Sequence, residues 1–479
     1  MRWPWDEWRH PTGRAGVSCD EGSLRPTGRY RRLPNVGVQP GLLRNVNRGA
    51  VLAVLRDGPR SRAALARETG LAKPTVSAIA EELLAEGLVR VGGVGAAQAA
   101  GGRRPELLEL DPGALSYLGV HFGVRHVQVA LADATGAIRA SRNGPATPRN
   151  PERALRLASS LAGHVLEEAG SSWSRVAAAA VAVPGTVERS TGRCRLAPNL
   201  GWRDVAIAEP LSARWGCRVV ACNIAQAGAL AEAAEGVARD VASFVWLYVG
   251  TGVGAAIVER GRLVEGRDGF AGEIGHMPIR AGGRRCGCGR RGCLETVSSG
   301  PAIARTAARA GLGARPSAVR SPAAAGRLET DGPGEPFGAA GRLGTESPVR
   351  AAGRLGTESP VPAAGASDAE WVAERAASGD ALAEVAIRTA AEALGRGVAT
   401  LVDLLNPELV VVGGGVADAG EVLLRPLRAS LADHGLPDSL APVVASDLGA
   451  LAELRGAIRL AMDAASTTMV VERAATARG

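Results

Sequence analysis

Between residues 113 and 300, apolar runs alternate with helical stretches, and this alternation restricts the fold more than any other feature of the chain. The runs read YLGVHFGVRHVQVALAD, RVAAAAVAVPG and SFVWLYVGTGVGAAIVERGRLV, and helical patterns lie between them at 151–169 and 225–238. Such alternation is typical of an α/β architecture. The 46% hydrophobic content is ample for a large core, and 479 residues favour two or three structural units.

Two segments differ from this pattern in composition. Residues 1–41 mix tryptophan, arginine, proline and glycine without a period, and we interpret them as a disordered tail or as the product of a start codon assigned too early. Within residues 314–366, AAGRLGTESPVR is followed directly by AAGRLGTESPVP, with glycine and proline spoiling any helix or strand period. We predict a disordered, repeat-containing insert there.

The segment SRAALARETGLAKPTVSAIAEELLAEGLV, residues 61–89, predicts a helix-turn-helix. Ser61 is a suitable cap for the first helix, and Gly70 is suited to end it in a left-handed turn. Pro74 opens the second helix, where its missing N–H costs nothing. Val76, Ile79, Ala80 and Leu83 then form an inward stripe. The alternative is a helical hairpin whose stripe is only core.

A wing and a DNA-contacting face complete this unit, which we place at residues 42–112. LVRV after Gly87 begins a strand, and ELLEL at 106–110 is its expected partner. The net charge of +8 permits a polyanionic partner such as double-stranded DNA. We expect small and basic residues to reach base edges, phosphates and a minor groove, namely Lys73, Thr75, Ser77, Ala78, Arg103 and Arg104.

The stretch GEIGHMPIRAGGRRCGCGRRGCLE, residues 272–295, predicts a metal site. Cys286, Cys288 and Cys293 with His276 supply three thiolates and one imidazole, the ligands of a closed tetrahedral zinc shell, so the zinc is expected to be structural. Free buried cysteines are the alternative. Three clustered cysteines among seven suit a reducing cytoplasm. Residues 1–30 contain no apolar stretch of the kind that a secretory signal needs, so we do not expect one, and no apolar run reaches the ~18 residues of a membrane span.

These segments together resemble the ROK family (repressor, open reading frame, kinase), and within it the xylose-repressor-like branch with an N-terminal winged helix-turn-helix. The resemblance rests on GGRRPELLELDP, on APNLGW, on GTGVG, on GEIGH with the cysteine cluster, and on NPELVVVGGG. It implies an actin-like, sugar-kinase-type domain of two α/β lobes over residues 113–479, with a sugar in the cleft. It further implies that the sugar hydroxyls are held by Asn223, Glu273, His276 and Glu295.

The chain departs from the family's kinases at two points. In CRVVACNIAQAGALAE, residues 217–232, a strand over Arg218–Cys222 leads through a loop into an alanine-rich helix, and Ile224 stands where the kinases carry a catalytic Asp. His121 stands where their first phosphate loop carries another Asp, followed by Val124 and Arg125. Isoleucine accepts no proton from a sugar hydroxyl, and loss of a general base typically costs ~10²–10⁴ in rate.

Three hypotheses about function follow. The first is a sugar-responsive transcriptional repressor, not an enzyme, whose homodimer or higher oligomer presents two DNA-binding units. The second is a sugar kinase with an added DNA-binding unit, against which Ile224 argues. The third is a DNA-binding protein with a decayed cleft, against which Glu273, His276 and Glu295 argue. GTGVG and the glycines at 413–415 suit either a nucleotide site or structural turns.

Overall fold

The computed structural model describes residues 40–94, 104–313 and 366–476. Its N-terminal part, which we call the head, has the element order of a winged helix: α1 (Pro40–Arg56), β1 (Arg60–Ser61), α2 (Arg62–Thr69), α3 (Lys73–Ala85), β2 (Val89–Val94) and β3 (Glu106–Leu110). The strands form an antiparallel sheet in the order β1-β3-β2. One apolar cluster, including Val51, Leu65, Ile79 and Leu108, holds the helices to it.

The first lobe of the body is built on a mixed five-stranded sheet in the order β11-β7-β4-β5-β6. Its elements are β4 (Ser116–Phe122), β5 (His126–Asp133), β6 (Ile138–Pro145), α4 (Pro151–Glu168), β7 (Val176–Val183), α5 (Ala208–Trp215) and β11 (Arg218–Asn223). A small antiparallel sheet of β8 (Thr186–Glu188), β9 (Arg193–Ala197) and β10 (Trp202–Ala206) adjoins it. The alanine and valine run of β7 is almost wholly buried, as expected of a central parallel strand.

The second lobe repeats this plan with the order β14-β13-β12-β15-β16. In each lobe the first three strands are antiparallel neighbours, and two more strands join in parallel. The strands are β12 (Phe244–Val249), β13 (Val253–Glu259), β14 (Arg262–Val264), β15 (Leu409–Gly413) and β16 (Val443–Ala445). Helices α7 (Glu295–Ser298), α8 (Gly300–Arg309), α9 (Ala366–Ala377), α10 (Ala381–Leu405) and α11 (Glu421–His434) complete the lobe.

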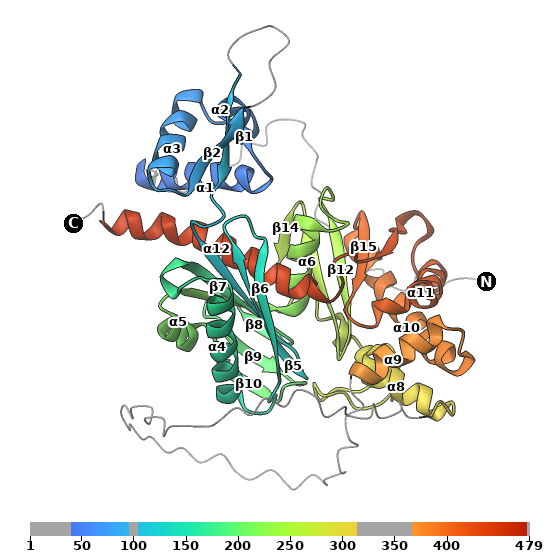
Figure 1. The fold of residues 1–479 in the computed structure, drawn as a ribbon. Coiled ribbons are helices and arrows are strands. Elements are labelled where there is room, and N and C mark those ends of the chain that lie inside the picture. The colour runs from blue at the N-terminus through green and yellow to red at the C-terminus, as the bar shows by residue number, and fades with distance from the viewer. Residues whose placement is uncertain (1–39, 95–103, 314–365, 477–479) are drawn as a thin grey trace, which may run out of the picture.

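Two helices join the parts of the molecule. Helix α6 (Ile224–Glu235) and helix α12 (Ala452–Thr476) pack against each other between the two sheets, and α12 also covers β4 and β7 of the first lobe. Figure 1 shows α12 passing beneath the head, where it contacts α1. The C-terminal helix therefore contacts both lobes and the head.

The expected fold class, an α/β two-lobed domain preceded by a winged helix-turn-helix, is confirmed. Two details differ from the sequence prediction. Strand β1 adds a third strand to the wing, and β11 passes straight into α6 without a loop, because Asn223 is both the last strand residue and the helix cap.

Residues 1–39 of the tail expected at 1–41, and residues 314–365 of the insert expected at 314–366, lie outside the described residues. Residues 40 and 41 instead begin α1, and Ala366 begins α9. Within the described ranges, no helix combines the length and the apolar character that crossing a membrane requires.

Candidate functional site

The head presents the start of α3 to solvent. Ser61 caps α2 by accepting a hydrogen bond from the Ala64 N–H at 3.2 Å, and Gly70 ends that helix with φ +69°. The predicted DNA-contacting residues of α3 then divide by exposure: Lys73, Ser77 and Ala78 are exposed, and Thr75 is half-buried. Arg104 is exposed before β3, and Arg103 lies outside the described residues.

The four predicted metal ligands come together in one loop of the second lobe. The ligand atoms of His276, Cys286, Cys288 and Cys293 all lie within 4.8 Å of one another. The Cys286 sulfur is 3.5 Å from Nδ1 of His276, and the sulfurs of Cys288 and Cys293 are 3.8 Å apart. One imidazole and three thiols at this spacing fit a tetrahedral metal such as zinc.

Tight turns bring these ligands together. Cys286 donates its backbone N–H to the Arg290 carbonyl at 2.7 Å, and Gly289 donates to the Cys286 carbonyl at 2.9 Å. Gly292 has φ +72°, and a Cβ added there would collide with the Arg280 carbonyl oxygen. Glycine is therefore required at the turn immediately before Cys293.

The four predicted sugar-contacting residues line one small polar cavity of about 60 Å³ between the lobes, the Glu273 cavity. They are Asn223, Glu273, His276 and Glu295. Nε2 of His276 lies 3.7 Å from a Glu273 oxygen, so its Nδ1 faces the cysteine cluster while Nε2 faces the cavity. The segment from His276 to Cys293 that carries the four candidate metal ligands, which we call the metal loop, therefore orients a residue of the cavity wall.

Two carboxyl groups dominate this cavity. Burial and the neighbouring Glu295 raise the pKa of Glu273 to about 7. Burial also raises the pKa of Glu295, which accepts a hydrogen bond from the Val253 N–H at 3.3 Å. The pair offers closely spaced oxygens, the arrangement that suits neighbouring hydroxyl groups of a ligand.

Asn223 and Ile224 lie where β11 ends and α6 begins. The Asn223 side chain accepts from the Ala225 N–H at 2.6 Å and donates to the Gly185 carbonyl at 2.6 Å, so it caps α6 as well as facing the cavity. Ile224 is 5% exposed in the first turn of α6. Asn199, which is not among the predicted site residues, also lines this cavity. Its only sequence signal is its place in APNLGW.

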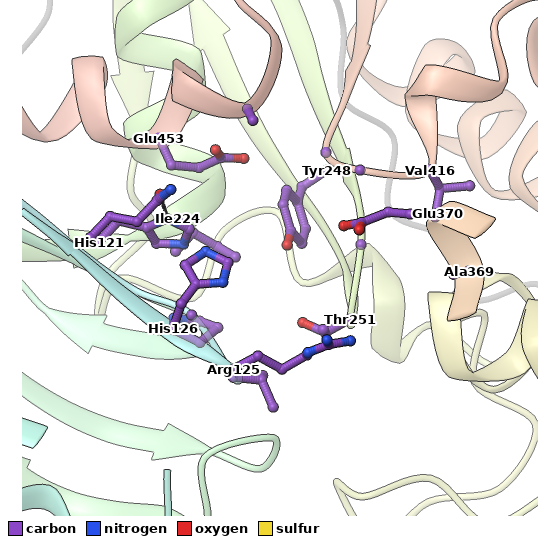
Figure 2. Close-up of a pocket in the computed structure, with 18 of the residues that line it drawn as sticks. His121, Arg125, His126, Ile224, Tyr248, Thr251, Ala369, Glu370, Val416 and Glu453 are labelled. Atoms are coloured by element: carbon purple, nitrogen blue, oxygen red, sulfur yellow. Dashed lines mark hydrogen bonds between the residues drawn. The ribbon is translucent and has the colours of Figure 1, made fainter. Parts of the chain in front are cut away.

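A second cavity of about 310 Å³, the Glu453 cavity, adjoins the first. Figure 2 shows Glu453, His121 and His126 on one side of it and Glu370 on the other, with Tyr248 between them. Gly250, Thr251, Gly414 and Gly415 of the two glycine-rich segments also line it. Burial lowers the pKa of His121 to about 4, and His121 Nδ1 lies 3.1 Å from Oε1 of Gln128.

Four residues line both cavities, and we call them the junction residues: Pro184, Ile224, Tyr248 and Thr251. A group transferred between molecules bound in the two cavities would pass beside them. None is a carboxylate or an imidazole, and burial raises the pKa of Tyr248. The junction therefore supplies no side chain that accepts a proton at neutral pH.

The fold and these cavities define a class of protein: a winged-helix head on a body of two similar α/β lobes with a polar cleft between them. The chain belongs to the ROK family, whose model matches residues 117–464. The IclR helix-turn-helix domain matches residues 49–92, within the head.

Three similar proteins represent both branches of the family. A xylose repressor of Caldicellulosiruptor bescii is 30% identical over 389 residues, which cover 81% of this chain and 87% of the repressor. A glucokinase of Thermotoga maritima is 32% identical over 57% of this chain and 75% of the kinase. The solved structure of a ROK family transcriptional regulator, a homologue of the E. coli MLC protein, has a TM-score of 0.68 at 26% identity and covers 90% of this chain and 100% of its own.

Proposed function

We propose that this protein is a sugar-responsive transcriptional repressor whose kinase-like body senses a sugar without phosphorylating it. One observation carries the proposal: a winged-helix head and a polar cleft share one chain, yet the junction residues include no base. Similarity to a xylose repressor and to a ROK transcriptional regulator supports this function. Operator DNA as the partner implies that the protein works in the cytoplasm.

The absence of a base at the junction separates this function from that of a kinase. A sugar hydroxyl has a pKa far above neutrality and must lose its proton during phosphoryl transfer. Ile224 presents a buried hydrocarbon side chain at that place, and the neutral His121 replaces an acidic residue near the glycine-rich segments. The similarity to a glucokinase makes catalysis the alternative that the experiment must exclude.

The Glu273 cavity is the proposed sugar site. Its carboxyl oxygens accept hydrogen bonds from sugar hydroxyls, and the amide of Asn223 and Nε2 of His276 complete the polar wall. A structural zinc ion held by His276 and the three cysteines would fix that imidazole and close the loop around it. Xylose is the first sugar to test, since one similar protein is a xylose repressor.

The DNA site is proposed on the exposed start of α3. Lys73 contacts phosphate, and Thr75, Ser77 and Ala78 are small enough to approach base edges in the major groove. Exposed Arg104 is proposed to contact the minor groove, and so is Arg103, which lies outside the described residues. Operators of such proteins have two half-sites, so a homodimer or larger oligomer is the working form.

The experiment measures DNA affinity and catalysis on the full chain. Binding of DNA from upstream of its own gene is followed by fluorescence anisotropy, with and without each of a panel of pentoses and hexoses. We expect one sugar to weaken DNA binding by the parent chain. Glu273→Gln should lose that response to the sugar. The control variant Glu392→Gln, at an exposed position, should keep it. Lys73→Ala should weaken DNA binding and lower the salt slope by about one.

A coupled assay with ATP and the same sugars provides the second readout. No turnover above background is expected from the parent chain. Robust phosphorylation would replace the proposal with the kinase alternative. DNA binding that no sugar alters would support the decayed-cleft alternative.

A further inference from the structure

Glu453 is a buried carboxyl group without a partner from another residue among those described. It lies in the first turn of α12, is 4% exposed, and forms its only identified hydrogen bond with its own backbone N–H. Figure 2 shows its carboxyl group directed into the Glu453 cavity. A buried carboxylate is costly unless it is paired. A positively charged group that entered the cavity would therefore find an unpaired buried carboxyl group there.

An aromatic ring and a second carboxylate lie opposite Glu453. Figure 2 shows the Tyr248 ring between Glu453 and Glu370. Both carboxylates are close enough to Tyr248 to raise the pKa of its hydroxyl, after burial itself. A ring face flanked by carboxylates is the usual environment of an organic ammonium ion, which is attracted by the π-system and by the negative charges.

The other charged groups that face the cavity agree with a cationic ligand. Glu370, Asp418 and Glu453 supply three carboxyl groups, against Arg125 as the single Arg or Lys among its described lining residues. The imidazoles of His121 and His126 have pKa values lowered mainly by burial, so they add no charge at neutral pH. Backbone N–H groups of the glycine-rich segments would favour an anion, but the carboxylates oppose one.

We propose that the Glu453 cavity binds a small alkylammonium ion, with its charge held by Glu453, Tyr248 and Glu370. This site adjoins the proposed sugar site, with which it shares Tyr248 and Ile224, and adds a second small-molecule ligand to the protein. An amine of a few carbon atoms fits a cavity of about 310 Å³. The ammonium group pairs the buried carboxylate, and its alkyl part covers Ile224 and Val416, which also line the cavity.

The test uses n-butylammonium chloride as the probe and n-butanol as its uncharged counterpart. Both are titrated into the full chain by calorimetry, in a buffer free of amines and of phosphate. We expect saturable binding of about one butylammonium per chain and none of butanol at equal concentration. Glu453→Gln keeps the shape and removes the charge, so it should weaken binding by about 10- to 100-fold, while the exposed control Glu392→Gln should not.

A further variant and a competition experiment complete the design. Tyr248→Leu removes the ring and should weaken binding by about 2- to 30-fold. Equal affinity for butanol and butylammonium, or unchanged affinity in Glu453→Gln, would overturn the proposal. So would displacement of butylammonium by inorganic phosphate or magnesium-ATP, which would make the cavity an anion site. The comparison of butanol with butylammonium needs no variant. Because the titrations and the competition experiment use neither DNA nor sugar, their outcome does not depend on the proposed repressor function.

Discussion

Replacing Glu453 by glutamine should make the protein more stable at alkaline pH. Burial raises the pKa of this carboxyl group from its ordinary value of 4.5 to about 7. The folded state therefore binds the Glu453 proton more tightly than the unfolded state does. Its contribution to stability is lost as the pH rises from 4.5 through 7.

The size of the effect follows from that pKa. One pKa unit corresponds to about 1.4 kcal/mol, so at pH 8 the ionised carboxylate opposes folding by about 3 kcal/mol. Glutamine has nearly the same shape and carries no charge. The variant should therefore gain up to about 3 kcal/mol at pH 8 and almost nothing at pH 4.5, where both side chains are neutral. A gain of this size raises the melting temperature by about 5 °C.

The assay is thermal unfolding of the parent, Glu453→Gln and Glu392→Gln chains between pH 4.5 and 8, in a buffer free of amines. Glu392 is exposed on α10, so its variant should follow the parent at every pH. The reasoning fails if Glu453→Gln is not more stable than the parent at pH 8, or if its gain is the same at pH 4.5. Saturating butylammonium should narrow the gap at pH 8, since it pairs the carboxylate only in the parent.

The other local predictions concern the metal loop and the first strand of the body. Replacing Cys286 and Cys288 by serine should release about one zinc ion per chain, measured by metal analysis, and weaken the sugar response. Gly292→Ala should also lower zinc content, because the added methyl group meets the Arg280 carbonyl. Burial lowers the pKa of His121 from 6.5 to about 4, so the unfolded state takes up this proton more readily than the folded state does. Stability that is present above pH 6.5 is therefore lost as the pH falls through 4. His121→Asn removes this proton uptake and should move the midpoint of acid unfolding to lower pH.

Local chemistry explains why so much of the head was predictable from sequence. The cap at Ser61, the left-handed Gly70 and the inward stripe of α3 each depend on residues within a few positions of one another. The two-residue strand β1 carries no such signal, because its pairing with β3 joins residues far apart in the chain, as Arg60 pairs with Leu108, 48 positions later. Short strands of this kind depend on tertiary contacts rather than on local pattern.

The same reasoning separates the two cavities. The four predicted sugar-contacting residues of the Glu273 cavity stand in short sequence motifs, so the resemblance to the ROK family located them. The structure brings all four to one cavity. The Glu453 cavity instead joins His121, Tyr248, Glu370 and Glu453, which are spread over more than 300 positions. A single glutamate at the start of a helix is usually exposed to solvent, where its charge interacts favourably with the helix dipole. Only the packing of α12 between the lobes shows that it is buried.

Helix α12 also suggests how the cleft and the head communicate. It begins at the Glu453 cavity, and ten residues later its Met462 carbonyl and Asp463 carboxylate accept hydrogen bonds from Arg56 of α1, at 3.2 and 3.3 Å. The Arg56 side chain is only 9% exposed, so this contact holds the head against the body. A movement of the lobes that shifts α12 should therefore reorient the head.

Arg56→Gln tests this coupling. The variant should bind operator DNA and sugar separately, because Arg56 lies in neither site, yet the factor by which sugar changes DNA affinity should fall by about 5- to 100-fold toward one. The measurement is DNA affinity by anisotropy with and without saturating sugar. Arg142→Gln is the control, since Arg142 pairs with Glu168 on the exposed surface of the first lobe. If Arg56→Gln keeps the full response, the signal reaches the head by a route other than this contact.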